Sequence, residues 1–449
     1  MKTEKVKESA TEPKQLKREL GWFGSTIMGL SSVIGVGIFV SLGLATEISG
    51  SAVIIALVVA GLVVACNSLN LSQLAVNHPV SGGVYEYGYK YLNPWLGFTG
   101  GWLFLLGKMA VAATAALSFA GYLLSTINVT DRDYLIPIAE AAIFIMTLVV
   151  LAGIRTSKIT TLVVISVTIS SLLFLMVSGL IVFPENALEN LAFSEHKSGN
   201  WIINQLKSIA LLFVAYNGAA RIALLSEEVV EPKKNIPKSV IITIVFTMFL
   251  YIGLAIVCLG SIGPSAFSEA AKVNAAPLEV VAKSFGIPIA PTIVMIGAVT
   301  AMLSILISTI LSLSRLILAM GRRGDMPGFL TQLNSAGSTP YWAVMAVGSA
   351  IGLLVLIGNV KTTWAFGTFG ALYRCFIVGL ATLRLSDEER LYPIAITWIA
   401  LISSVVLAFC LDWQVWLIGL GVVGIGLLWH WVAERISLTA DLSTMVNEE

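Results

Sequence analysis

Two glycines, Gly35 and Gly37, interrupt an apolar segment near the start of the chain. Glycine reaches backbone conformations that other residues avoid, and its missing side chain lets a ligand approach the main chain. A helix broken here would present N–H groups at the start of its second half, and such groups attract an anion such as a carboxylate. We expect the N–H groups of residues 38–40 to be these donors, while carbonyls of residues 32–34 could meet an amine or a cation.

A second interruption, Ala215-Tyr216-Asn217-Gly218, follows about half the chain later. Unwound backbone survives at membrane depth only where protein or a water-filled cavity satisfies its polar groups. Two such interruptions, one in each half, indicate the midplane binding site of a secondary transporter for a small solute. Helix packing through small residues is the alternative for either break alone. The break residues expected at the substrate are Ile34, Gly35, Val36, Gly37, Ile38, Phe213, Ala215, Tyr216 and Gly218.

Membrane helices must position these residues. The chain has 449 residues, of which 57% are hydrophobic and 12% charged, and its mean hydropathy is +0.89. A soluble domain carries about 25% charged residues, so the composition excludes a soluble enzyme. The four cysteines all fall in apolar spans and indicate neither a disulfide nor a metal site, and we expect no cofactor.

We predict an all-α membrane protein with twelve transmembrane helices. The expected spans are 22–46, 51–76, 95–126, 134–153, 159–183, 201–226, 238–262, 287–320, 340–358, 363–384, 392–411 and 413–433. Spans one and six carry the breaks, and five crossings between equivalent elements predict a 5+5 inverted repeat with discontinuous helices 1 and 6. Two C-terminal helices are additions. The expected parts are an N-terminal arm at 1–20, repeat one at 21–183, repeat two at 201–384, additional helices at 392–433 (transporter domain 21–433) and a tail at 434–449.

Lysine and arginine are distributed unequally between the loops. With the N-terminus inside, seventeen of them fall in inner segments and five in outer loops. This asymmetry predicts that both termini are cytoplasmic, in a plasma membrane of bacterial type. The long loops at 184–200 and 263–286 are then expected outside.

Several motifs resemble those of the amino acid–polyamine–organocation (APC) superfamily, in the family's order. They lie at 34–39, 79–87, 101–102, 215–218, 227–237, 314–315 and 321–327, within a resemblance that covers roughly residues 20–390. The resemblance implies the leucine-transporter fold, alternating access, and an amino acid held between spans one, three, six and eight. Three departures stand out: Val36 replaces a common serine, Ala220 followed by Arg221 replaces a common acid, and span five lacks a central lysine. The last departure disfavours the family's usual route of proton coupling.

Lys108 lies about ten residues into span three, near the membrane midplane. An ammonium there costs about 3 kcal/mol on insertion scales, so it should face a cavity or a partner. The resemblance places this stretch, together with Ala112, against the substrate. Lys108 then either attracts an anionic group of the substrate or carries a proton; the alternative is a lysine whose head reaches cytoplasmic water.

No carboxylate falls near the expected site, which disfavours cationic substrates because their charge would lose its hydration without a partner. Neutral amino acids are expected first and acidic ones next. Proton symport, sodium symport and exchange all stay open. Ser304 and Ser308, with Thr309, could complete an oxygen site for Na⁺, as in sodium-coupled members of the fold, or could bond back to their own helix. The residues expected to couple or gate transport are Lys108, Ala220, Arg221, Glu227, Ser304 and Ser308.

Several other polar and aromatic residues are expected to form gates or to anchor the helices at the membrane interface. Glu227 and Glu228 end span six, where a gate or a bridge to Arg315 is expected. Gate candidates are Phe213, Tyr216 and Trp102, and expected interfacial anchors are Trp364, Trp413 and Trp416.

Two rival functions remain open on the sequence. One is an organic-anion carrier that uses Lys108 and Arg221. The other is a non-transporting membrane sensor, although no sensor module is apparent at either end. We expect no enzymatic activity, because no catalytic cluster or nucleotide motif occurs in a suitable context. The expected partners are an amino acid, the lipid bilayer and a co-transported H⁺ or Na⁺, without nucleic acid.

Overall fold

The computed structural model describes residues 18, 20–79, 82–127, 129, 131–153, 158–192, 200–224, 226, 228–273, 276–334 and 339–447. Within these ranges the chain is helical and forms no sheet; an isolated bridge pairs Leu20 with Val229. In the part of the chain that the structure describes, eight helical stretches are long and apolar enough to cross a membrane, and three shorter apolar helices accompany them.

The elements follow one another along the chain in this order: α1 (Trp22–Val33), η1 (Gly37–Ser41), α2 (Leu42–Ser49), η2 (Gly50–Ala52), α3 (Val53–Asn77), α4 (Val84–Tyr91), α5 (Pro94–Thr126), η3 (Arg132–Tyr134), α6 (Leu135–Leu151), α7 (Lys158–Ile181), α8 (Ala187–Leu191), α9 (Trp201–Tyr216), η4 (Asn217–Ala219), α10 (Ala220–Leu224), α11 (Pro232–Val273), α12 (Pro277–Ser284), α13 (Ala290–Arg322), η5 (Gly328–Thr331), α14 (Tyr341–Val355), α15 (Val360–Leu383), α16 (Ile394–Cys410) and α17 (Trp413–Asn447).

Each expected span overlaps a helix, but two expected boundaries differ from the structure. The expected loop at 263–286 is largely helical: Gly263 turns the chain at φ 78°, and Pro264 and Pro277 begin short helical stretches. Helix α17 also runs unbroken past residue 433, where a tail was expected. No glycine or proline occurs between residues 427 and 447, so nothing in the local sequence ends this helix there.

Helix α5 is the centre of the packing. It contacts α4, α6, α13, α14, α15 and α17. Its first turn is fixed by Pro94 and by Asn93, whose Oδ1 accepts a hydrogen bond of 2.8 Å from the N–H of Leu96. Farther along, Gly107 faces Gly370 of α15: a Cβ on Gly107 would lie 3.0 Å from the Cα of Gly370. Small residues thus let α5 and α15 approach closely, as is common between membrane helices.

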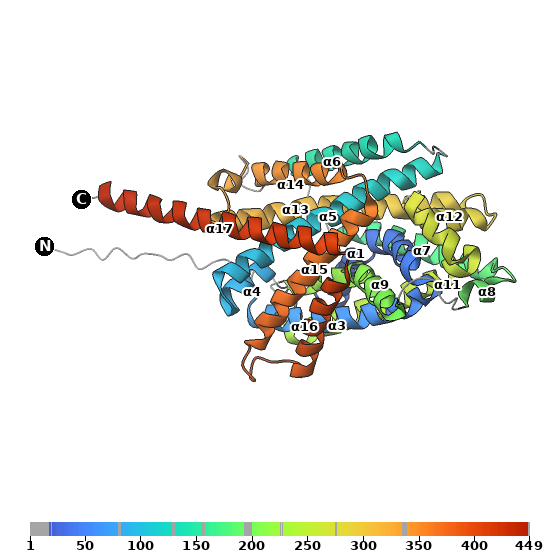
Figure 1. Cartoon of the computed structure of the whole chain (residues 1–449), viewed down its shortest axis with the longest axis horizontal. Coiled ribbons are helices and arrows are strands. Elements are labelled where there is room, and N and C mark those ends of the chain that lie inside the picture. The colour runs from blue at the N-terminus through green and yellow to red at the C-terminus, as the bar shows by residue number, and fades with distance from the viewer. Residues whose placement is uncertain are drawn as a thin grey trace.

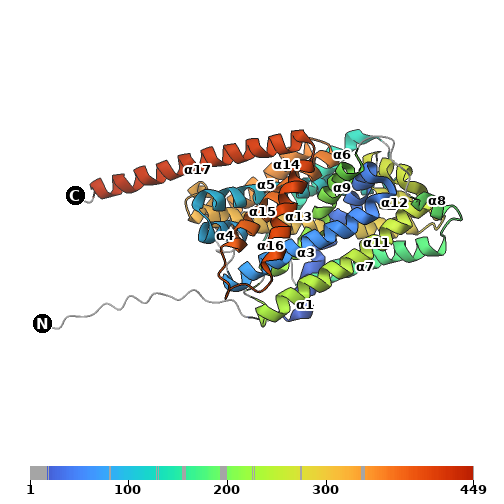
Figure 2. The same ribbon diagram turned by 60° about the horizontal axis from the view of Figure 1, so that its bottom comes forward.

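The two ends of the bundle carry different elements. Helix α4 lies at one end, and α8 and α12 lie at the other (Figures 1 and 2). We call these the α4 end and the α12 end. The last turns of α17 project beyond the α4 end in both views.

Candidate functional site

The two helix breaks lie directly against each other. Helix α1 ends where Ile34 becomes extended (φ −79°, ψ 95°), and the chain resumes as the π-helix η1; at the second break, α9 passes into the 3₁₀ turn η4. A Cβ on Gly218 would collide with the backbone of Ser32 and Val33, and a Cβ on Gly37 would lie 2.6 Å from the Cα of Ala215. The missing side chains of Gly37 and Gly218 therefore allow the backbones of the two breaks to touch.

Tyr251 of α11 joins the two breaks. Its buried hydroxyl donates towards the carbonyl oxygens of Val33 at 3.0 Å and Ala215 at 3.4 Å. These carbonyls lie in the last turns of interrupted helices, where C=O groups lack partners within the helix. The ring of Tyr216 lies 5.0 Å from that of Tyr251, so it supports this tyrosine. The sequence analysis did not identify Tyr251 as a residue of the site. A tyrosine hydroxyl inside an apolar span needs a hydrogen-bond partner, and this need could have pointed to it.

A cavity of about 70 Å³ lies beside the breaks. Since one water needs roughly 10–15 Å³ by this measure, it has room for about five waters or a small solute. Its walls come from α1, η1, α5, α9, η4, α13 and α15. The lining residues are Ser31, Ser32, Val33, Val36, Gly37, Phe104, Gly107, Lys108, Val111, Val214, Asn217, Gly218, Ile305, Ser308, Thr309, Trp364, Gly367, Ala371 and Arg374.

The cavity brings together five of the residues expected at the substrate or the coupling site, namely Val36, Gly37, Lys108, Gly218 and Ser308. Other expected residues fill the packing around it or lie away from it: Ile34, Gly35, Ile38, Ala112, Phe213, Ala215, Tyr216, Ala220, Arg221 and Ser304. At Gly35, for example, a Cβ would run into the side chain of Ile305. Glu227 lies outside the described residues.

The expected roles of two tryptophans change. The prediction that Trp364 anchors the chain at the membrane interface is wrong, because its side chain is 1% exposed and lines the cavity. Its Nε1 donates a 2.9 Å hydrogen bond to the carbonyl oxygen of Leu211 on α9, which satisfies the indole inside the protein. Trp102, expected as a gate, does not line the cavity; its Nε1 donates to the carbonyl oxygen of Val422 on α17 at 3.1 Å. The aromatic side chains that do line the cavity are those of Phe104 and Trp364.

The charged groups among the described residues of the cavity wall are cationic. Lys108 and Arg374 line it, and these described lining residues include no aspartate or glutamate. Arg374 Nη2 donates a 2.5 Å hydrogen bond to Oδ1 of Asn217 in the second break. Such a wall attracts anionic groups and repels cations.

Two of the three hydroxyl residues of α13 that the sequence offers as oxygen ligands for a cation lie at the cavity. Ser308 and Thr309 line the cavity beside residues 31–33, whereas Ser304 does not. Ser308 Oγ donates back to the carbonyl oxygen of Ile305 at 3.1 Å, as serines in membrane helices commonly do. In the described ranges, no group of three or more His, Cys, Asp or Glu side chains is placed to hold a metal ion.

A buried polar cluster joins three segments at the α4 end. Asp325, just after α13, accepts hydrogen bonds from Tyr85 at 2.5 Å and Tyr89 at 2.6 Å, both on α4. His430 Nδ1 of α17 lies 3.1 Å from the other carboxylate oxygen of Asp325. Burial, together with the hydrogen bond to Asp325, raises the pKa of each tyrosine phenol, so both remain protonated donors.

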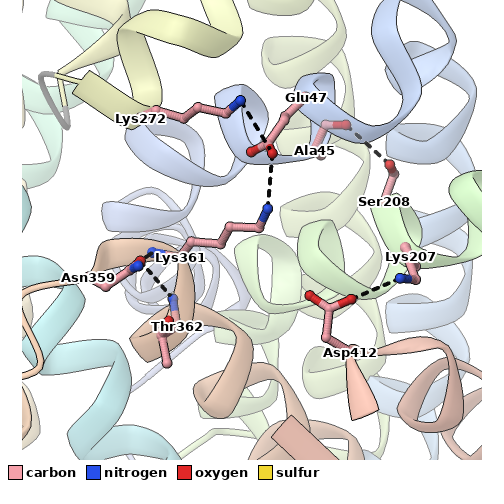
Figure 3. Close-up of polar contacts among 9 residues, drawn as sticks. All are labelled: Ala45, Glu47, Lys207, Ser208, Lys272, Asn359, Lys361, Thr362 and Asp412. Atoms are coloured by element: carbon pink, nitrogen blue, oxygen red, sulfur yellow. Dashed lines mark hydrogen bonds and ion pairs between the residues drawn. The ribbon is translucent and has the colours of Figure 1, made fainter. Parts of the chain in front are cut away.

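Ion pairs join the helices at the α12 end. Figure 3 shows Glu47, near the end of α2, between Lys272 of α11 and Lys361 of α15. The Nζ atoms of Lys272 and Lys361 lie 3.4 Å and 3.0 Å from Glu47 Oε1. Nearby, Lys207 of α9 pairs with Asp412 at 2.8 Å. The cavity is lined from the middle of the long helices, between these pairs and the Asp325 cluster.

Comparisons with known proteins agree with this architecture. A family model described as amino acid permease matches residues 24–382. The chain is 31% identical to an uncharacterized transporter of Mycobacterium tuberculosis, over 95% of this chain and 94% of the relative. It is 27% identical to the branched-chain amino acid permease BcaP of Bacillus subtilis, over 89% of this chain and 88% of the relative. It is 24% identical to the mitochondrial cationic amino acid transporter 3 of Arabidopsis thaliana, over 82% of this chain and 62% of the relative.

These matches confirm the resemblance read from the motifs. The match to the family model covers most of the chain and includes both helix breaks and the residues that line the cavity. The chain therefore belongs to the amino acid permease family of the APC superfamily, and it is a multi-pass membrane transporter rather than an enzyme.

Proposed function

We propose that the protein is a secondary active carrier that moves an amino acid across the plasma membrane by alternating access. The observation that carries the proposal is the cavity of about 70 Å³ at the contact between the two helix breaks. A carrier needs states open to each side that differ by only a few kcal/mol, and a ligand shifts their populations through differential affinity. In this cycle the hydrogen bonds of the Asp325 cluster would break when the α4 end opens, and the Glu47 ion pairs would break when the α12 end opens.

In this proposal the apolar helices form twelve spans, with α1 to α7 and α9 to α15 as inverted repeats and with α16 and α17 added. The α4 end faces the cytoplasm, because it is the end at which lysine and arginine concentrate in the sequence. Both termini are then cytoplasmic, in a plasma membrane of bacterial type.

The substrate's α-carboxylate is assigned to the start of the second half of span one. The helix resumes at η1, so the N–H groups near Gly37 have no partner within the helix. The α-amino group is assigned to the carbonyl oxygens near Ser32 and Val33, whose residues line the cavity. Both assignments use main-chain groups and therefore bind any amino acid, whatever its side chain.

The cavity wall selects among side chains. A small volume whose described lining residues include no carboxylate favours neutral and acidic amino acids over cationic ones. Coupling to H⁺ or Na⁺, or exchange of one amino acid for another, is part of the same proposal, with Ser308 and Thr309 as the candidate Na⁺ ligands. An organic-anion carrier is the second candidate, favoured by the cations in the cavity wall. Its sequence-based partner residue, Arg221, is not in that wall, and Arg374 takes its place.

The test is uptake of radiolabelled alanine, leucine, glutamate and arginine by purified protein in liposomes. Uptake is measured with and without a pH gradient, a Na⁺ gradient and internal amino acid. Saturable uptake of at least one amino acid supports the proposal, and protein-free liposomes give the background. The absence of saturable uptake for all four, under every gradient and with internal exchange partners, would overturn it in favour of another solute.

A further inference from the structure

Lys108 and Arg374 are brought onto one cavity wall by the close packing of α5 and α15. Gly107 precedes Lys108, and Gly370 lies one helical turn before Arg374. A Cβ on Gly370 would lie 2.9 Å from the Cα of Gly107 and 2.8 Å from the carbonyl oxygen of Leu103. Only glycine fits between the helices at this level, so the two cations are held near each other by backbone contact rather than by flexible side chains.

The guanidinium of Arg374 is buried and only partly satisfied. Arg374 is 6% exposed, and its Nε is buried without a hydrogen-bond partner. The hydrogen bonds that it does make go to neutral atoms, Oδ1 of Asn217 at 2.5 Å and Sγ of Cys375 at 3.6 Å. The ring of Phe104 lies 5.9 Å away on another side. An always-charged, five-donor group in this setting has donors left for a ligand.

The charge of this wall has no counter-charge among the described residues of the cavity. Lys108 and Arg374 both line it, and the described lining residues include no carboxylate. A buried charge without a counter-charge is strongly unfavourable, and cationic groups at membrane depth are normally paired or face water. An anion bound between Lys108 and Arg374 would supply the missing counter-charge.

We propose that Lys108 and Arg374 bind a carboxylate on the side chain of the substrate, so that the protein selects acidic amino acids. This inference rests on the proposed function, in which main-chain groups at the helix breaks bind the α-carboxylate and the α-amino group. The second carboxylate then accepts hydrogen bonds from the N–H groups in the plane of the Arg374 guanidinium. Their planar arrangement matches the two oxygens of a carboxylate better than a lysine ammonium does. Arg374 is the specificity-determining residue, and Asn217 positions it.

The experiment compares aspartate and alanine uptake by wild-type protein and by the variants Arg374→Gln, Arg374→Lys and Arg384→Gln in liposomes. Arg384 is the matched control, because it ends the same helix but is exposed and away from the cavity. We expect wild-type protein to take up aspartate with a KM at least 10-fold below that for alanine. Arg374→Gln should raise the aspartate KM about 10- to 100-fold and the alanine KM less than 3-fold, since charge-assisted hydrogen bonds are the strong ones.

A second measurement guards against misfolding and distinguishes the source of the anion. The melting temperature of each purified variant is measured with aspartate, with alanine and with chloride alone. Stabilisation by aspartate that is lost in Arg374→Gln and partly kept in Arg374→Lys supports the proposal, even if no uptake is seen and the proposed transport is wrong. Stabilisation by chloride alone, with alanine uptake that needs chloride, would overturn it in favour of an inorganic anion. Alanine uptake that aspartate neither inhibits nor replaces would also overturn it, and would leave the transport function standing.

Discussion

Asp325 accepts a hydrogen bond of 2.5 Å from the phenol of Tyr85, a residue 240 positions away in the sequence. Tyr89 donates to the same carboxylate oxygen, and the indole Nε1 of Trp429 donates to the main-chain oxygen of Asp325 at 2.9 Å. Arg323 lies over the Tyr89 ring and pairs with Glu86 at 2.8 Å. One short segment after α13 thus holds α4 and α17 together at the α4 end.

Removal of the Asp325 charge should destabilise this end. Asp325 is 6% exposed, and Asp325→Ala would leave the two buried phenols of Tyr85 and Tyr89 without their acceptor. Loss of one partner in a buried charged network costs about 3–5 kcal/mol, so we expect a clear fall in melting temperature in detergent. Asp387→Ala is the control, since its pair with Arg390 is exposed and should be worth at most about 1 kcal/mol. Equal melting temperatures for the two variants would contradict the structural role of Asp325.

Tyr251→Phe should loosen the contact between the helix breaks without changing their sequence. The variant keeps the ring but leaves the carbonyls of Val33 and Ala215 without this donor. Burying unsatisfied polar groups costs about 1–3 kcal/mol, so the melting temperature should fall and the substrate KM should rise. Tyr341→Phe, which loses only an exposed hydrogen bond to Gln332, is the control and should match wild type in both measurements.

Gly218→Ala should abolish most transport. The added Cβ would collide with the backbone of Ser32 and Val33, and overpacking of this kind typically costs about 1–3 kcal/mol. Because the break would have to move away from α1 and distort the cavity, we expect uptake to fall more than 10-fold. Gly421→Ala is matched in chemistry, but no atom lies within 4 Å of its Cβ, so its uptake should be unchanged. Normal uptake by Gly218→Ala would show that the breaks need not touch.

Glu47→Gln should favour the state open at the α12 end. It removes the carboxylate that faces Lys272 and Lys361, and so leaves two lysines to repel each other. Opening is measured as the reaction rate of Ser308→Cys with a membrane-impermeant thiol reagent, after the four native cysteines are replaced by serine. We expect a rate several-fold above that of the Glu47 parent, and no increase in Asp412→Asn, whose pair with Lys207 is more exposed. A rate below that of the parent would count against these ion pairs as a closing contact.

Glu279 predicts a pH dependence of stability at the α12 end. Its carboxylate is 0% exposed on α12; burial raises its pKa, while Lys283 at 3.1 Å acts in the opposite direction. The folded state favours the protonated form of Glu279. Its contribution to the free energy of unfolding is therefore fully present below the pKa that the group has in the unfolded chain, and it is lost as the pH rises through the higher pKa of the folded state. Glu279→Gln should therefore melt higher than wild type at pH 8, and the gap should shrink towards pH 5. A gap that widens towards pH 5 would contradict the direction of the shift.

The sequence predicted the helices because each is a long apolar stretch, and it predicted the breaks because each half of the chain carries a glycine-containing interruption inside such a stretch. Boundaries at the α12 end were less predictable. The segment after Gly263 is polar enough to resemble a loop, but it folds into short helices that pack against the bundle. Periodicity is weak over eight to ten residues, so only the tertiary contacts decide such segments.

Site residues were predictable where a single residue is unusual for its surroundings in the sequence. Lys108 is a charge at membrane depth, and Gly37 and Gly218 lie at the breaks; all three line the cavity. Arg374 carried a similar signal, but its nearness to Lys108 depends on how α5 crosses α15, which no local pattern encodes. Trp364 was misassigned because a tryptophan near the end of a span usually marks the interface, whereas here a carbonyl on α9 satisfies its indole.

Helix α17 extends well beyond the point at which it contacts the α4 end. It is clamped near its middle, where His430 and Trp429 contact Asp325, and it continues from there to Asn447, a further distance of about 26 Å at 1.5 Å per residue. Figure 1 shows this arm standing clear of the bundle. A tilt too small to resolve at the clamp therefore becomes a displacement of several ångströms at the tip. If the α4 end opens in the proposed transport cycle, a dye placed there would report each opening in real time, without any change to the cavity itself.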